Sequence, residues 1–282
     1  MLTTENIHLN IGRKNILHNV SFQANKGELL AIVGANGAGK SSLLKIISGD
    51  TSASKGSTKL NGKLIHQYKK TELAKIRAVL AQSFSLNLSF LVKEVVMMGR
   101  YPHFNEIPTS QDHLWVEKAL QETAVYHLKE RVYTNLSGGE KQRVQLARVL
   151  AQVWKEEKAH ADEKAHFLFL DEPVSSLDLL QQHKTLNLAC KLKRKGFVVI
   201  AVLHDLNLAS QYADKILMLK EGTVIAFGKT RDVLTPEHIL EGFGMPVSLH
   251  QHPEYNYPFI IPNPLKQVPK KETYKTVLTI DN

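Results

Sequence analysis

The sequence predicts an α/β fold in which a mainly parallel sheet carries an N-terminal antiparallel β subdomain and an inserted helical subdomain. A nearly continuous apolar run at 28–34 ends in glycine, which is typical of a buried strand in a parallel sheet. Apolar runs of the same kind return at 166–173 and 196–205. Between about 84 and 165, in contrast, apolar residues recur at helical spacing. The 282 residues suffice for one or two domains with a sizeable core.

The first third of the chain is expected to form strands around a single helix. Apolar and polar residues alternate on both sides of Gly12, which predicts two antiparallel strands joined by a turn. After the strand at 28–34, the spacing of apolar residues predicts a helix that ends at Gly49. Residues 55–66 then predict a hairpin that turns at Asn61-Gly62.

The rest of the chain is expected to alternate between helices and strands. Helical stretches at 92–100, 111–125 and 140–154 are interrupted at Gly99, Pro102 and Pro108. The polar segment at 155–166 predicts an exposed loop or a helix extension, and the proline-rich stretch from 246 predicts an extended arm with a loose tail. We therefore expect a nucleotide-binding core in two parts, a helical subdomain and a C-terminal extension, with boundaries at 1–83, 84–165, 166–245 and 246–282.

The composition limits the partners and the cellular compartment that can be expected for this protein. The net charge of +9 suits an anionic partner, which could be nucleic acid, a nucleotide or a membrane surface. The densest basic cluster, at 191–196, is interpreted as the solvated end of a helix, where lysines complement the helix dipole. The single cysteine, Cys190, predicts a buried thiol, no internal disulfide and a reducing compartment. The longest apolar run, at 197–203, is too short to cross a bilayer, and the N-terminus lacks the pattern of a secretory signal.

A glycine-rich segment between the strand at 28–34 and the following helix has the spacing G-x-x-x-x-G-K-S. Its glycines let successive backbone N–H groups face one point, and the helix adds its positive N-terminal end. Lysine then supplies a charge to the β- and γ-phosphates, and the serine hydroxyl is a ligand for Mg²⁺. The predicted phosphate-binding residues are Gly34, Ala35, Asn36, Gly37, Ala38, Gly39, Lys40, Ser41 and Ser42.

Two acidic residues stand at the C-terminal end of the apolar run 167–170, at the edge of the sheet where ligands of open α/β folds bind. Asp171 is placed to hold Mg²⁺, and Glu172 to orient or deprotonate an attacking water. With the phosphate loop, these residues predict a nucleoside triphosphatase. A kinase needs the same loop, so these two motifs leave the phosphoryl acceptor open.

A second anion site is predicted at Leu136-Ser137-Gly138-Gly139-Glu140, just before the helical stretch at 140–154. A serine hydroxyl, free N–H groups and a helix N-terminus meet there. With this motif the sequence resembles the ATP-binding cassette family of transport ATPases, over roughly residues 3–245. The resemblance implies a P-loop NTPase core and a head-to-tail homodimer, in which the signature loop of one chain closes over ATP held by the other.

The remaining motifs stand in the order that the family shows. Gln82 matches the glutamine loop, which the resemblance implies senses Mg²⁺ and the attacking water. Asp178, in Ser176-Leu177-Asp178, matches the loop at the dimer interface, and His204 matches the switch histidine that touches the γ-phosphate. The resemblance thus implies ATP and Mg²⁺ as cofactors, Ser41, Gln82 and Asp171 as Mg²⁺ ligands, and Glu172, His204 and Gln82 as catalytic residues. One position departs from the family: Ile11 stands where an aromatic residue often stacks on adenine.

Within the family, a single cassette without its own membrane span resembles the bacterial importers. The segments at 204–228 and 95–104 resemble importers of iron chelates, haem and cobalamin, and those at 155–166 and 245–262 resemble haem importers. The resemblance implies haem uptake at the cytoplasmic face of the inner membrane, through a separate permease dimer supplied by a periplasmic binding protein. Ferric siderophore or cobalamin import is the alternative, and a non-transport ATPase acting with nucleic acid is a remoter one. His250 and His252 are interpreted as part of a polar tail and not as haem ligands.

Overall fold

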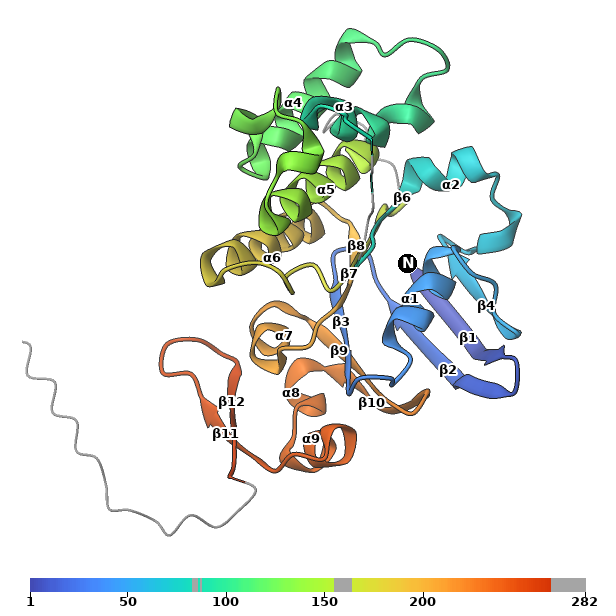
Figure 1. Cartoon of the computed structure of the whole chain (residues 1–282). Coiled ribbons are helices and arrows are strands. Elements are labelled where there is room, and N and C mark those ends of the chain that lie inside the picture. Colours follow the sequence, from blue (N-terminus) through green and yellow to red (C-terminus); the bar gives the residue numbers. More distant parts are fainter. Residues whose placement is uncertain (83–85, 87, 155–163, 265–282) are drawn as a thin grey trace, which may run out of the picture.

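The computed structural model describes residues 1–82, 86, 88–154 and 164–264, and its centre is a six-stranded sheet (Figure 1). The strands stand in the order β10-β9-β3-β8-β7-β6, and all neighbours except the β10–β9 pair are parallel. Every residue of β3, β7 and β8 is buried, as their apolar runs predict. The strands are β3 (Leu29–Gly34), β6 (Arg77–Leu80), β7 (Phe167–Asp171), β8 (Val198–Val202), β9 (Lys215–Lys220) and β10 (Thr223–Lys229).

A second, antiparallel sheet has the order β2-β1-β4-β5. It contains β1 (Leu2–Ile11), β2 (Lys14–Ala24), β4 (Lys55–Leu60) and β5 (Lys63–Leu64). The predicted hairpin turn is confirmed, because Asn61 and Gly62 both adopt positive φ, at 50° and 79°. The helix α1 (Lys40–Ser48) shares one apolar core with both sheets and ends at Gly49, as expected.

Helices cover the other face of the central sheet (Figure 1). Those between β6 and β7 form the predicted helical insertion, and α5 joins them and the sheet in one apolar core. The short α2 (Lys70–Ile76), preceded by the 3₁₀ turn η1 (Ile65–Gln67), was not predicted. The others are α3 (Val92–Met97), η2 (Met98–His103), α4 (Ser110–Glu122), η3 (Tyr126–Leu128), η4 (Tyr133–Asn135), α5 (Gly138–Val153), α6 (Leu179–Arg194), α7 (Leu206–Tyr212), α8 (Thr230–Val233) and α9 (Pro236–Phe243).

The expected break at Gly99 and Pro102 takes a different form. The α-helix ends at Met97, but the chain continues through both residues as the 3₁₀ helix η2. Proline is tolerated there because its fixed φ is compatible with a short helical turn. Glycine is required at position 99, since a Cβ would lie 2.1 Å from the carbonyl oxygen of Arg148 on α5.

Arg100 follows this close contact and is only 5% exposed. Its Nε donates to Asp112 Oδ1 at 3.0 Å, and its guanidinium also donates to the carbonyls of Ala151 at 2.6 Å and Trp154 at 3.2 Å. Burial lowers the pKa of Arg100, opposed by the Asp112 carboxylate. One buried cation therefore joins η2, α4 and the C-terminal end of α5.

The C-terminal segment corrects one prediction. Instead of an extended arm, residues after Pro246 form a hairpin of β11 (Val247–Gln251) and β12 (Pro258–Pro262). Its prolines at 258 and 262 stand at the ends of a strand that pairs on one side, where a missing N–H costs little. The predicted loose tail beyond residue 264 and most of the polar segment 155–166 lie outside the described residues.

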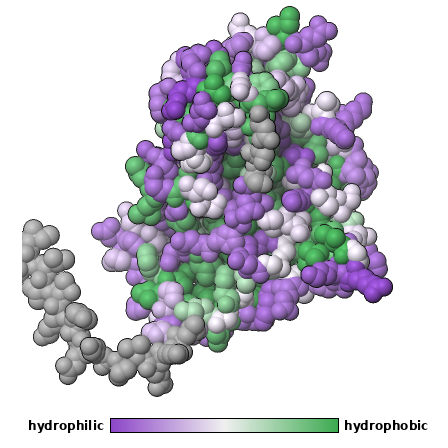
Figure 2. Space-filling model, viewed as in Figure 1, coloured by the Kyte–Doolittle hydropathy of each residue, from purple (hydrophilic) through white to green (hydrophobic). Residues whose placement is uncertain are grey.

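The surface in view is mostly polar. Figure 2 shows hydrophilic residues over much of the face in view, with apolar residues scattered among them. Among the helices in the described part of the chain, none combines the length and the apolar character needed to cross a membrane. Cys190 is buried, as predicted, and burial raises the pKa of its thiol.

We expect Arg100→Ala to lower the free energy of unfolding by about 3–5 kcal/mol, because it leaves the buried Asp112 carboxylate without its partner. The matched control is Lys93→Ala, which breaks an exposed ion pair with Glu130 and should cost less than about 1 kcal/mol. Urea unfolding measures both changes. Equal midpoints for the two variants would contradict this role of Arg100.

Candidate functional site

The phosphate loop joins β3 to α1, and a positive φ together with close neighbours disfavours any side chain at two of its glycines. Gly34 has φ 152°, and a Cβ there would lie 2.3 Å from the carbonyl oxygen of Leu219. Gly39 has φ 97°, and a Cβ would lie 2.8 Å from Leu17 Cδ2. The loop borders a cavity of about 330 Å³, which is lined by Ile16, Asn36, Gly37, Ala38, Gly39, Lys40, Ser41, Ser42, Glu172 and His204.

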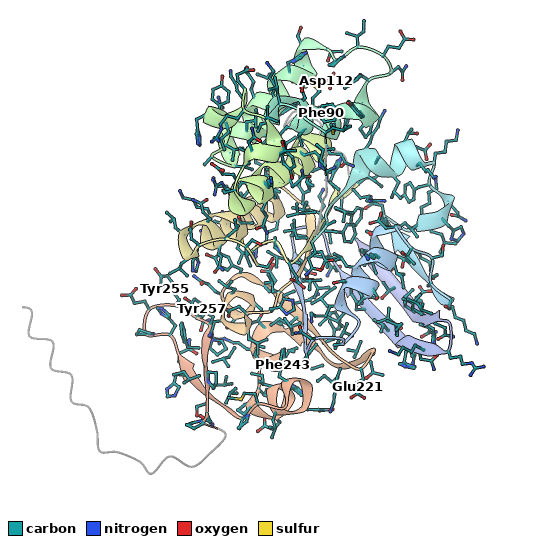
Figure 3. The ribbon with its side chains drawn as sticks, in the orientation of Figure 1. Phe90, Asp112, Glu221, Phe243, Tyr255 and Tyr257 are labelled. Atoms are coloured by element: carbon teal, nitrogen blue, oxygen red, sulfur yellow. The ribbon has the colours of Figure 1, made fainter. Side chains whose placement is uncertain are left out.

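The β9–β10 turn is hydrogen-bonded to the phosphate loop. The sequence analysis did not predict this contact. Glu221, labelled in Figure 3, and Gly222 both have positive φ. Gly222 N donates to the carbonyl of Ala38 at 3.1 Å, and its own carbonyl accepts from His18 N at 2.8 Å. The Glu221-Gly222 pair is a turn signal, but the sequence does not say what the turn touches.

Lys40 supplies the positive charge of the cavity. Its Nζ donates to the carbonyls of Gly34 at 2.8 Å and Ala35 at 2.9 Å. Burial lowers the pKa of Lys40, and the carboxylates of Glu172 and Asp171 oppose that effect. The ammonium group is thus already inside the cradle where phosphate oxygens are expected to bind.

Ser41 and Asp171 meet as predicted. The Ser41 Oγ donates to Asp171 Oδ1 at 3.0 Å. Burial raises the pKa of Asp171, and the hydrogen bond from Ser41 works against it. A hydroxyl beside a buried carboxylate is a donor set that suits Mg²⁺, and the cation's charge would favour the ionised carboxylate.

Gln82, Glu172 and His204 also converge, although they follow three different strands. The Glu172 Oε2 accepts from Gln82 Nε2 at 2.9 Å, and its Oε1 lies 2.5 Å from His204 Nε2. Both oxygens of the carboxylate are thereby oriented. Gln82 contacts the glutamate here, and its role as a Mg²⁺ ligand stays a prediction.

Gln142 is a further residue of the site that the sequence analysis missed. Its Nε2 donates to the carbonyls of Pro173 at 2.7 Å and Glu172 at 3.4 Å. The Glu172 backbone is in the left-handed region, with φ 50°, which is unfavourable for a residue with a Cβ. Gln142 is therefore a positioning residue that supports this conformation from the first turns of α5. Helical periodicity places it on a helix but does not show what it faces.

The signature loop is built as a helix cap. Ser137 Oγ accepts from Glu140 N at 3.3 Å, while Glu140 Oε2 accepts from Ser137 N at 2.8 Å. Hydrogen bonds from the Ser137 backbone and side chain to the Glu140 carboxylate lower the pKa of Glu140. Asp178 caps α6 in a similar way, by accepting from Gln181 N at 2.9 Å. A contact of Ser137, Gly138, Gly139, Glu140 or Asp178 with nucleotide stays a prediction, because none of them lines the cavity at the phosphate loop.

The residue that the resemblance places near adenine does not line the cavity at the phosphate loop. Ile11 is 62% exposed at the end of β1 and does not line the cavity, whereas Ile16 on β2 does. The contact of Ile11 with adenine stays a prediction. Ile16 was not singled out because the motif comparison fixes a position relative to Gly12 and not the path of the following strand.

Comparison with known proteins places these features in one family. Residues 17–175 match the ABC transporter family. The chain is 44% identical to the Hemin import ATP-binding protein HmuV of Gloeobacter violaceus, over 93% of this chain and 94% of that protein. It is 41% identical to the protein of the same name from Methylobacillus flagellatus, over 92% and 95%.

Solved structures agree with this placement. A metal-chelate type ABC transporter in an inward-facing conformation has a TM-score of 0.76 and 30% identity, covering 94% of this chain and 98% of that one. A dimeric post-hydrolysis state of the ATP-binding cassette MJ0796, bound to ADP and Pi, has a TM-score of 0.70 and 25% identity, covering 82% and 99%.

We expect Gln142→Glu to lower the kcat of ATP hydrolysis roughly 10–100-fold with little change in KM, since a small displacement of a reacting group can cost about 100-fold. The matched control is Gln152→Glu, on the same helix, whose amide donates to the carbonyls of Ala74 and Arg77 outside the site. It should lower stability but spare kcat. A loss of kcat shared equally by both variants would mean that Gln142 supports only the fold.

Proposed function

The chain belongs to the ABC transporter family, and from this premise we propose that it is the ATP-hydrolysing subunit that powers haem import through a separate permease. The observation that carries the proposal is the pairing of a complete phosphate loop and catalytic carboxylate with relatives named for hemin import. We propose that it hydrolyses ATP at the cytoplasmic face of the inner membrane. Ferric siderophore or cobalamin import is the alternative cargo assignment.

We infer that the working ATPase is a head-to-tail dimer. Within one chain the cavity presents only the phosphate-loop side of a nucleotide site, and the capped N-terminus of α5 lies outside its lining. A helix N-terminus is suited to bind anions. The dimeric cassette MJ0796, which is similar to this chain, supports dimerisation. In the proposed dimer, Ser137 of one chain faces the γ-phosphate held by Lys40 of the other.

Each residue of the site then has a separate role in the proposed hydrolysis of ATP. Lys40 and the loop N–H groups bind the phosphates, and Ser41 and Asp171 would hold Mg²⁺, which supplies positive charge to the phosphate oxygens when bound. Glu172 orients the attacking water and accepts its proton. Gln82 and His204 hold the two carboxylate oxygens of Glu172 in place for that task.

The permease is proposed to dock on the helical insertion. An apolar cavity of about 400 Å³ opens there between α3, η2 and α4, and Phe90, labelled in Figure 3, lies in its wall. Tyr101, at its rim, is exposed. An apolar cavity rimmed by the charged residues Lys93, Glu94 and Glu106 suits a short helix of a partner protein.

We expect Glu172→Gln and Ser137→Arg each to reduce ATP hydrolysis, the first by about 10²–10⁴-fold with binding retained. If the site is shared, mixing the two inactive variants restores activity, because a mixed dimer keeps one site with both Glu172 and Ser137 intact. Random mixing of a two-fold dimer predicts about a quarter of the wild-type rate. Steady-state phosphate release measures it. No recovery, with mixed dimers shown to form, would rule out the shared site.

We expect vesicles that contain the permease and this chain to take up haem with ATP, and unlabelled haem to compete better than ferric siderophores or cobalamin. The Glu172→Gln chain is the control for ATP-driven uptake. Preferential competition by a siderophore or cobalamin would replace the cargo assignment. Hydrolysis stimulated by DNA or RNA, without uptake of any of the three, would favour the non-transport alternative.

A further inference from the structure

A second large cavity lies away from the phosphate loop. It has a volume of about 1000 Å³ and shares no lining residue with the cavity that contains Lys40. Its walls come from the end of α6, the α7–β9 connection, α8 and the turn between β11 and β12. Figure 3 shows Tyr255 and Tyr257 on that turn, at the side of the molecule where α6 and α7 lie. Nothing in the proposed ATPase reaction uses this cavity.

The hairpin wall is fixed in place by hydrogen bonds to α7. Ser210 Oγ donates to the carbonyl of Pro258 at 2.7 Å. Asn207 both accepts from Ile260 N at 2.8 Å and donates to its carbonyl at 3.2 Å. Across the cavity, Arg231 donates to the carbonyl of Asn256 at 3.2 Å. The turn between β11 and β12 is therefore held in place by hydrogen bonds as one wall of the cavity.

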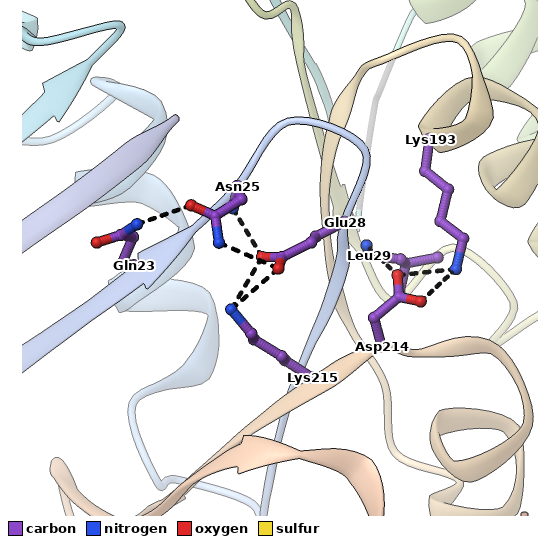
Figure 4. A network of polar contacts seen from close by, with 7 residues as sticks. All are labelled: Gln23, Asn25, Glu28, Leu29, Lys193, Asp214 and Lys215. Atoms are coloured by element: carbon purple, nitrogen blue, oxygen red, sulfur yellow. Dashed lines mark hydrogen bonds and ion pairs between the residues drawn. The ribbon is translucent and has the colours of Figure 1, made fainter.

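The charges around the cavity leave an excess of cations. Figure 4 shows that Glu28 is paired with Lys215 and that Asp214 is paired with Lys193. The other charged side chains of the lining are Arg194, Lys229 and Arg231 against a single acid, Asp232. The cavity therefore favours a ligand with more than one negative charge.

The turn also offers a surface for an aromatic ring. Tyr255 is 57% exposed and lies parallel to Tyr257, with ring centroids 6.0 Å apart and an interplanar angle of 11°. The His252 ring lies 4.8 Å from that of Tyr255 and 5.0 Å from that of Tyr257. Its Nδ1 accepts from the N–H groups of Glu254 and Tyr255, which fixes the ring against the turn.

We propose that this cavity binds a planar aromatic molecule carrying at least two negative charges, by stacking on Tyr255 and by ion pairs with Arg194 and Arg231. The volume is at the upper end of the range for small-molecule sites. A porphyrin dicarboxylate and a nucleoside phosphate share this chemistry. The choice of a porphyrin as first probe rests on the proposed haem transport, whereas the site itself does not.

The test is equilibrium binding of iron-free protoporphyrin IX, followed by its fluorescence, to the nucleotide-free full chain. We expect one site per chain, and about tenfold weaker binding for Tyr255→Ala and for Arg194→Glu. Tyr255→Phe keeps the ring and should bind as wild type. Lys184→Glu reverses an exposed charge ten residues earlier on α6 and is the control for Arg194→Glu. Thermal unfolding verifies that the variants are folded.

The alternatives have distinct outcomes. Hemin should bind as tightly as the iron-free porphyrin, since no iron ligand is required. If AMP binds with the same dependence on Tyr255 and Arg194 and the porphyrin does not, the site stands and its ligand is a nucleotide. Binding that is unchanged in both Tyr255→Ala and Arg194→Glu overturns the proposal, and so does the absence of binding by either probe. Because the assay contains no permease, its failure leaves the transport test of the proposed function unaffected.

Discussion

The parallel pairing of β3, β8, β7 and β6 is the constraint on which the site depends. Parallel strands end at the same edge of a sheet, so the residues that follow them must meet. Lys40 follows β3, His204 follows β8, Glu172 follows β7 and Gln82 follows β6. Lys40, Glu172 and His204 thus reach one cavity, and Gln82 reaches Glu172, although the four segments are far apart in the sequence.

Much of this arrangement could be predicted from the sequence because its signals are local. The glycine spacing of the phosphate loop, the two acids after an apolar run and the histidine after another each identify a strand end. Contacts between elements could not be predicted in this way. Gln142, the Gly222 turn and the buried Arg100–Asp112 pair lie on elements that were expected, yet what they touch depends on how those elements pack. The C-terminal hairpin was missed because its prolines suggested an extended chain.

The helix α5 connects the parts of the molecule that must work together. Its N-terminus carries Ser137, its second turn holds the backbone at Glu172 through Gln142, and its last turn accepts hydrogen bonds from Arg100. The insertion and the sheet also share one apolar core. A displacement of the helical insertion would therefore reach the Glu172 carboxylate through a helix of 16 residues.

The left-handed backbone at Glu172 has a consequence for stability as well as for chemistry. A side chain other than glycine costs about 1–2 kcal/mol in that conformation. Glycine at this position would relieve the strain but remove the carboxylate. With Glu172 in its proposed role, a substitution that relieves this strain raises stability at the cost of turnover.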